Sequence, residues 1–220
     1  MTTDVFSGLV AGLTDRLANL PKAWDGRQCI LQMQSQGSTH WRQMEWIGWY
    51  LEFYCHRNLN GLLKMPGPRY GNVGFDGFGD VPWDFKTHAT DGKQHKIIVN
   101  DRVAILNALR EYGAVGLILA IGHAQYDDEI GSFKQWHEEL KGGKSAYTQA
   151  REARGARSRR RKAAFVVDRI DLIRFTDKTL SKCGEFQKGF RNSDGSPRAT
   201  KVLLSTADIQ DEVVGQVLIR

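Results

Sequence analysis

Three aspartates and one lysine lie close together in the stretch Asp76-Gly-Phe-Gly-Asp80-Val-Pro-Trp-Asp84-Phe-Lys86. The run from Val81 to His88 has strand character, and side chains alternate between the two faces of a strand. Asp84 and Lys86 are therefore expected on one face, roughly 6–7 Å apart at their Cα atoms. A carboxylate beside a lysine can hold a divalent cation and position a water, which suits hydrolysis of phosphodiesters.

Two residues are candidates for a second carboxylate beside Asp84. If Gly77–Gly79 forms a bend, a strand over residues 72–76 pairs with the strand holding Asp84, and Asp76 lies across from Asp84. Asp80 precedes Asp84 by four residues, roughly 13 Å along an extended strand. It joins the same site only if Pro82 forces a bend or bulge. Both remain candidates, with Asp76 preferred.

The hydrophobic pattern indicates a mixed α/β fold in a single domain over residues 1–220. Helices are expected at 1–20, at about 40–57 with Ser38 or Thr39 as cap, at 101–112 ended by Gly113, at 132–140, and at about 145–163. The apolar run 115–122 predicts a central strand, and residues 165–175 alternate as in an edge strand. Residues 96–99 and two segments flanking the turn 192–195 are the other expected strands.

Composition excludes a membrane-spanning protein, because no apolar run reaches the necessary length. The first twenty residues lack the pattern of a secretion signal. Cys29, Cys55 and Cys183 match no zinc-ligand spacing and are expected to be reduced thiols, which favours a cytoplasmic location.

Basic residues concentrate in two segments of a chain whose net charge is +6. Such segments attract a polyanion with an affinity that falls steeply with salt. The first segment supplies the DNA-binding candidates Arg151, Arg154, Arg157, Arg159, Arg160, Arg161 and Lys162. The second is the turn region 187–198, where Lys188, Arg191, Asn192 and Arg198 are the candidates. Arginine and asparagine can read base edges, but arginine runs usually contact phosphate, and a solvated basic turn is the alternative.

The segment Asp84-Phe85-Lys86 resembles the second half of the motif of the PD-(D/E)xK nuclease superfamily, and within it the type II restriction endonucleases. The first half departs from that motif, since neither Asp76 nor Asp80 follows a proline and the gap is shorter than usual. The resemblance spans about residues 40–125. It implies a restriction-endonuclease-like core, a central mixed β-sheet flanked by helices, with DNA-recognition elements at about 145–200.

The resemblance also implies a set of site residues. Members often add a glutamate from a helix before the hairpin, and Glu45 and Glu52 lie near one face of the 40–57 helix. Glu45 is favoured because Gly48 would let that helix approach the sheet. The implied catalytic residues are Asp84, Lys86, Asp76, Asp80 and Glu45, with one or two Mg²⁺ ions held by Asp84 and by Asp76 or Asp80.

The activity that the resemblance implies is that of a Mg²⁺-dependent endonuclease that cuts double-stranded DNA at specific sequences. Cutting both strands calls for two symmetric active sites, so a homodimer is expected. Two alternatives remain open at this point. One is a repair or junction-resolving nuclease with the same core, and the other is a nucleic-acid-binding protein without catalysis.

Overall fold

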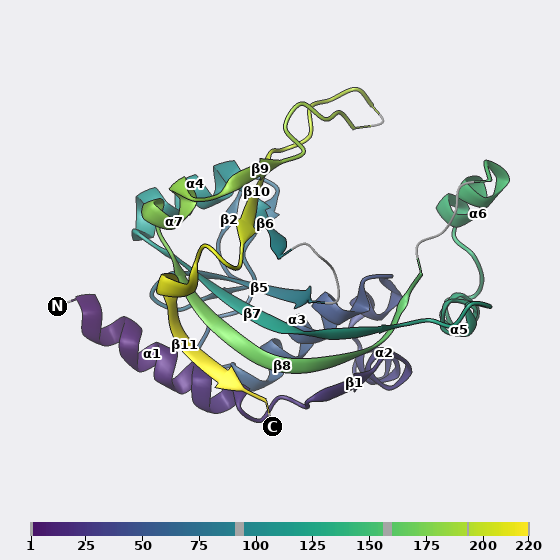
Figure 1. The fold of residues 1–220 in the computed structure, drawn as a ribbon, viewed down its shortest axis with the longest axis horizontal. Coiled ribbons are helices and arrows are strands. Elements are labelled where there is room, and N and C mark those ends of the chain that lie inside the picture. Colours follow the sequence, from purple (N-terminus) through teal and green to yellow (C-terminus); the bar gives the residue numbers. More distant parts are fainter. Residues whose placement is uncertain (1, 91–94, 156–159, 193, 220) are drawn as a thin grey trace.

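The computed structural model describes residues 2–90, 95–155, 160–192 and 194–219. It is a mixed α/β fold built on a curled central sheet with helices on both sides (Figure 1). The strand order is β1-β8-β7-β5-β4, with β11 also paired to β8. β5 and β7 are parallel, and the other pairs are antiparallel. The strands are β1 (Ala23–Asp25), β4 (Gly77–Phe78), β5 (Pro82–Ala89), β7 (Val115–Tyr126), β8 (Lys162–Phe175) and β11 (Val213–Leu218).

The two faces of the sheet belong to two separate hydrophobic clusters. On β7, Ile118 and Ala120 pack with α1 (Thr2–Leu17), α2 (Gly26–Ser35) and α3 (Trp46–Asn58). The alternate residues Leu117 and Leu119 enter the second cluster. That cluster includes α4 (Arg102–Tyr112), α7 (Asp177–Ser181), β6 (Lys96–Asp101) and β10 (Lys201–Ser205). Because β7 is covered on both faces, its sequence is continuously apolar.

The remaining elements lie outside the main sheet. β6, β10 and β9 (Gly184–Phe186) form a three-stranded antiparallel sheet, and β2 (Arg69–Tyr70) pairs with β3 (Val73–Gly74). Two 3₁₀ turns cover Thr39–Arg42 and Gln210–Glu212. α5 (Ser132–Leu140) and α6 (Ala146–Ala153) lie beyond the end of β7 (Figure 1). No helix in the described ranges is long and apolar enough to cross a membrane.

Several sequence predictions are confirmed. α4 follows Asp101, its N-cap residue, and ends at Gly113, which has a φ of 74°. α5 has the predicted bounds. The predicted central strand at 115–122 is central, and it continues to Tyr126 because its last residues pair with the start of β8.

Several predicted elements are wrong in extent or position; the strands expected beside the turn 192–195, for example, are β9 and β10, which lie away from that turn. The 40–57 helix begins only at Trp46, after a short 3₁₀ turn in which Ser38 Oγ accepts a hydrogen bond from the His40 amide. The 145–163 helix stops at Ala153, and Lys162 already belongs to β8. The predicted edge strand at 165–175 is interior, because β7 pairs with one side of it and β1 and β11 with the other. Its alternating polar residues are held by neighbours instead of solvent, as Arg169 is by Asp171.

Candidate active site

The β4–β5 hairpin places Asp76 opposite Asp84. Phe78 pairs with Pro82 and Gly77 with Trp83, and the Asp76 amide donates to the Trp83 carbonyl at 2.9 Å. The bend predicted at Gly77–Gly79 is wrong, since the turn comes after Phe78, where the Gly79 amide donates to the Val81 carbonyl. The expected juxtaposition nevertheless exists, because moving the turn by two residues leaves Asp76 just before β4.

Asp84 and Lys86 lie on the same face of β5, as strand alternation predicts. Lys86 Nζ is 2.8 Å from Asp84 Oδ1. Asp84 is only 2% exposed, and its Oδ2 is buried with no hydrogen-bond partner among the described residues. A buried carboxylate oxygen without a partner is costly, so this atom favours the arrival of a cation or a donor.

Asp76 is the second carboxylate of the site. Its Oδ2 accepts a hydrogen bond from the Phe85 amide at 2.6 Å. Burial and the nearby charge of Asp84 raise the pKa of Asp76 to about 8, while Lys86 works in the opposite direction. Near neutral pH Asp76 therefore holds a proton, which a cation bound at this carboxylate would displace.

Lys86 remains protonated in this setting. Burial lowers the pKa of its amine, but the charges of Asp84, Asp76 and Glu52 and the hydrogen bond to Asp84 outweigh burial, so that the pKa lies above its usual value. A protonated lysine donates hydrogen bonds and stabilises negative charge, and it is a poor general base.

Asp80 does not join the pair. It is exposed in the turn that follows Phe78. Pro82 opens β5 and lies opposite Phe78, so that it produces no bulge that would bring Asp80 back. A proline fits this first strand position because it has no amide hydrogen to contribute to the ladder.

Glu52, and not the favoured Glu45, faces Asp84 and Lys86 from α3. Burial raises the pKa of Glu52, with His40, His56 and Lys86 opposing that shift and Asp84 adding to it. Glu45 precedes the helix as its N-cap residue, is 76% exposed, and lies 3.9 Å from Lys162 Nζ. The prediction failed because it assumed a helix that already contains residue 45. α3 does pack on β5 at Gly48, but a Cβ there would lie 3.8 Å from Thr87 Oγ1, an ordinary contact distance, so the packing does not require a glycine.

Asp76, Lys86 and Glu52 line one cavity of about 610 Å³ between α3, β5 and the β2–β3 hairpin, and Asp84 is buried beside Lys86. Glu45 lies on its rim, and the cavity also contains residues that the sequence did not indicate, notably His40, His56 and Arg69. Their separation in the chain hid them, because Arg69 lies in a segment predicted as loop and the histidines occur in no recognisable motif. His40 stacks on Trp49 with ring centroids 3.9 Å apart.

The donor set fits one kind of metal ion better than others. No group of three or more His, Cys, Asp or Glu side chains within the described ranges is arranged as a complete metal site. Two opposed carboxylates with an unsatisfied oxygen suit Mg²⁺, which typically takes one or two protein carboxylates and completes its shell with water and phosphate oxygens. Asp84 and Asp76 are the residues that would hold it.

The basic block at 151–162 is largely bound to its own surroundings. Arg154 donates to the Ala150 carbonyl, Arg160 to the Asp127 carbonyl, and Arg161 to Met44 Sδ. Lys162 lies 3.9 Å from Glu45. Arg157 and Arg159 lie outside the described residues.

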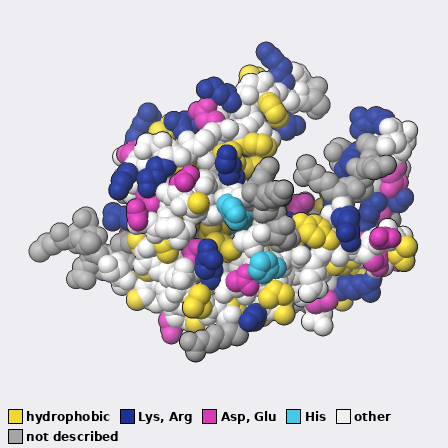
Figure 2. All heavy atoms as spheres, in the orientation of Figure 1, with side chains coloured by type: hydrophobic (Ala, Val, Ile, Leu, Met, Phe, Trp, Pro, Cys, Tyr) yellow, Lys and Arg dark blue, Asp and Glu magenta, His cyan; other side chains and the backbone are white. Residues whose placement is uncertain are grey.

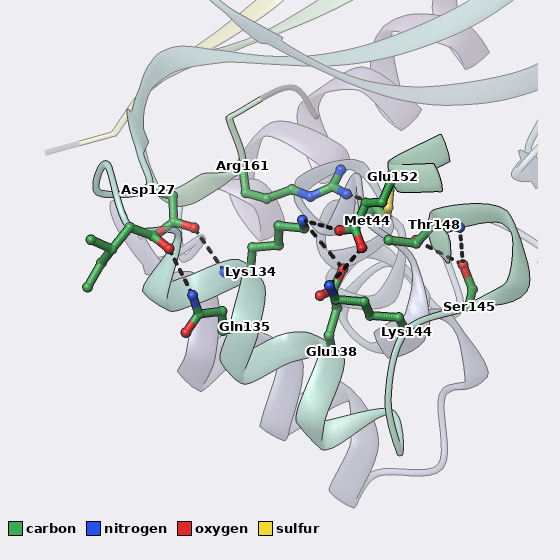
Figure 3. A network of polar contacts seen from close by, with 11 residues as sticks. Met44, Asp127, Lys134, Gln135, Glu138, Lys144, Ser145, Thr148, Glu152 and Arg161 are labelled. Atoms are coloured by element: carbon green, nitrogen blue, oxygen red, sulfur yellow. Dashed lines mark hydrogen bonds and ion pairs between the residues drawn. The ribbon is translucent and has the colours of Figure 1, made fainter. Parts of the chain in front are cut away.

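Within the described residues one ion pair, Lys134 with Glu152, joins α5 to α6, as Figure 3 shows. Glu152 receives Lys144 at 2.7 Å and Lys134 at 3.4 Å, and Lys134 also lies 3.9 Å from Glu138. The carboxylate of Asp127 accepts hydrogen bonds from the first amides of α5, those of Phe133 and Lys134. The Lys144–Glu152 pair is exposed on both sides, and a pair of this kind contributes little stability.

The turn region 187–198 uses two of its four candidate residues to hold its own shape. Arg191 Nη1 donates to the Gly195 carbonyl at 2.7 Å, and Asn192 Nδ2 donates to Ser196 Oγ at 2.9 Å. Lys188 pairs with Glu185. The Arg198 amide donates to the Phe190 carbonyl at 2.8 Å, and both side chains are exposed, Phe190 at 56%. Arg198 is therefore the candidate cation of this turn that is most open to a ligand.

Parts of both basic segments lie on extensions of the molecule, whereas residues 160–162 lie at the start of β8. In Figure 1 the chain between β9 and β10 extends at one end, and α5 and α6 extend at another. Figure 2 shows that the outline is hollowed between these projections and that Lys and Arg side chains occur on both. The candidate site on β5 belongs to the body between them.

Comparison with known proteins gives no relative for this chain. No protein-family model, no curated protein and no solved structure matches it.

Proposed function

We propose that this protein is a Mg²⁺-dependent endonuclease that hydrolyses phosphodiester bonds in double-stranded DNA, of the type II restriction class. The observation that carries the proposal is the pairing of Asp76 with Asp84 and Lys86 across the β4–β5 hairpin, with Asp84 Oδ2 left without a partner among the described residues. Mixed sheet, preceding helix and acidic hairpin together support a restriction-endonuclease-like core over about residues 40–125.

The acidic residues and the lysine of the site have different roles. Asp84 and Asp76 hold the cation, and Asp76 must lose its proton when they do so. When bound, Mg²⁺ supplies the Lewis acidity that polarises a phosphoryl oxygen and makes water a better nucleophile. Lys86 donates from a protonated ammonium and stabilises charge that develops on the phosphoryl group. Glu52 lines the same cavity and is the third carboxyl group assigned to orient water.

We infer the substrate from the open cavity and from the charge of the chain. The cavity is open and bordered by Arg69 and His56, and the net charge of the chain is +6, so a polyanion is the natural ligand. A cut through both strands needs two such sites, which supports a homodimer. Light scattering of the protein with and without a DNA duplex measures the assembly state.

Substitution of the central pair tests the proposal. Asp84→Ala and Lys86→Ala should each lower cleavage of plasmid DNA about a thousandfold or more, while binding to duplex DNA persists. Asp80→Asn is the matched control, because it removes an aspartate charge from the same hairpin but at the exposed turn. Cleavage retained in both alanine variants would reject the assignment.

The pattern of products separates the restriction class from its nearest rival. Discrete, reproducible bands from a mapped plasmid support a sequence-specific enzyme. Cutting confined to branched DNA would instead identify a junction-resolving nuclease built on the same residues. Binding without any Mg²⁺-dependent cleavage would identify a non-catalytic DNA-binding protein.

A further inference from the structure

A second cavity of about 530 Å³ adjoins the candidate active site. It is lined by Met44, Glu45, Tyr126, Arg160, Arg161 and Lys162. Glu45 lines both cavities, so the second one begins where the first one ends. Its chemistry differs sharply from that of the first, since three consecutive basic residues replace the buried carboxylates.

The backbone of this basic tripeptide is fixed in place. The Asp127 amide donates to the Arg161 carbonyl at 2.7 Å, and Trp46 Nε1 donates to the Lys162 carbonyl at 2.7 Å. Lys162 is also the ladder partner of Tyr126 across β7 and β8. Trp46 is only 1% exposed, so the link ties the tripeptide to the main core. The cations therefore stand on a rigid support.

Arg161 is poorly satisfied in this position. Its Nη2 donates to Met44 Sδ, a weak acceptor, and within the described ranges it forms no ion pair. Burial lowers the pKa of its guanidinium, against the opposing charges of Glu45, Glu138 and Asp127. Figure 3 shows Arg161 extended beside Met44, above the Lys134–Glu152 contacts of α5 and α6. A guanidinium with free donors in a cavity is suited to binding a phosphate oxygen.

Glu45 is the acidic side chain that lines the cavity, and Glu138 and Asp127 also act on Arg161. The Glu45 carboxylate lies 3.9 Å from Lys162 Nζ, and the side chain is 76% exposed, so the pair is weak and easily separated. Arg160 is committed to the Asp127 carbonyl, which leaves Arg161 and Lys162 as the cations available to a ligand.

We propose that this cavity binds a backbone phosphate of the DNA strand next to the phosphate that is cut, and that Glu45 is the counterion which this phosphate displaces. The assignment of DNA as the ligand rests on the proposed function. The acidic cavity cuts one phosphodiester, and the basic cavity holds a neighbouring one through Arg161 and Lys162. Glu45 thus opposes DNA binding in the free protein.

Binding of a fluorescein-labelled random-sequence duplex of about 20 base pairs tests this inference, measured by anisotropy in EDTA over a range of salt. Glu45→Gln should bind about threefold to tenfold more tightly than the wild-type protein at about 0.1 M salt. The control Glu139→Gln makes the same charge change at an exposed position of α5 outside the cavity, and it should change affinity by less than about twofold.

Substitutions of the two cations should have the opposite effect and lower the affinity for DNA. Arg161→Gln should weaken binding about tenfold and lower the salt slope by about one, whereas Arg110→Gln on the exposed face of α4 should do neither. Lys162→Gln repeats the test at the second cation of the cavity should the arginine variant prove unstable by thermal melting. If Glu45→Gln matches Glu139→Gln, or both cavity cation variants match Arg110→Gln, the inference is wrong.

The outcome is separable from that of the proposed function, because these measurements contain no divalent metal. If binding changes as expected but no Mg²⁺-dependent cleavage is found, the phosphate cavity is supported and the nuclease proposal is rejected. Cleavage that depends on Asp84, together with unchanged binding in Glu45→Gln, would keep the nuclease and reject the cavity.

Discussion

The acidic site on β5 and the basic projections differ in what holds their side chains. Asp84 and Lys86 are placed by a strand that pairs along its length with β7; Lys86 lines a cavity, and Asp84 is buried behind it with one carboxylate oxygen unpartnered among the described residues. Arg191 and Asn192 are placed by a turn, and they spend their hydrogen bonds on that turn. A polar side chain is therefore available to a ligand where the backbone around it makes its hydrogen bonds without that side chain, whatever the residue type.

The largest contrast is expected between the two glutamates before and within α3. Glu52→Gln should lower kcat for DNA cleavage about tenfold to a hundredfold, because Glu52 shares the field of Asp84 and Lys86. Glu45→Gln should leave kcat within about twofold and act on binding alone. Single-turnover cleavage at saturating enzyme measures both. Equal losses of kcat would place Glu45 in the chemistry and contradict the contrast.

The next largest effect is expected on the free energy of unfolding, at a glycine of β7 that packs against β5. Gly116 lies opposite Trp83, next to Asp84, and a Cβ there would approach the indole ring to 2.2 Å. Gly116→Ala should destabilise the protein by about 2–3 kcal/mol in urea unfolding, since the buried ring has little room to move. Gly189→Ala, in the open turn with a φ of 78°, should cost about 1 kcal/mol through backbone strain alone. If Gly189→Ala proved more destabilising than Gly116→Ala, the turn region would be better packed than the surroundings of Gly116.

Asp76 gives the acidic site a pH dependence that the basic regions lack. Its pKa in the folded protein is about 8, well above that of an unfolded aspartate. The folded protein therefore binds more protons than the unfolded chain between about pH 4 and pH 8, and without metal its free energy of unfolding falls as the pH rises through that window.

Asp76→Asn removes this titration and keeps an acceptor for the Phe85 amide. In EDTA the variant should be more stable than the wild-type protein by about 1–3 kcal/mol at pH 8.5, and the difference should shrink toward pH 5. Added Mg²⁺ should stabilise the wild-type protein more strongly as the pH rises, and should have little effect on the variant. Thermal melts at several pH values measure both; a pH-independent difference would show that Asp76 is ionised throughout.

The smallest effect is expected in the turn between β9 and β10. Arg191→Gln and Asn192→Ala should change duplex affinity by less than about threefold, because both side chains are engaged within the turn. Arg198→Gln, from the same turn, should weaken binding more than either. Anisotropy titrations at constant salt rank the three variants. A loss of specific cleavage in Asn192→Ala alone would restore that residue as a reader of bases.

Local pattern was sufficient for much of the fold. The alternation of Asp84 and Lys86, the apolar run of β7 and the bounds of α5 follow from period and composition, and the structure has all three. The sequence also brought Asp76 near Asp84, although it placed the turn two residues too early, because hairpin register depends on which glycine starts the bend.

The pair on β5 and a nearby first aspartate could be read from the amino-acid order alone, because both depend on neighbours in the chain. Three-dimensional packing was needed to establish that Glu52 and not Glu45 faces this pair, that Arg69 borders the cavity, and that Arg161 and Lys162 stand beside Glu45. These relations join residues distant in sequence through the packing of α3 against β5 and of β8 against β7. Period and spacing within one segment carry no information about such contacts.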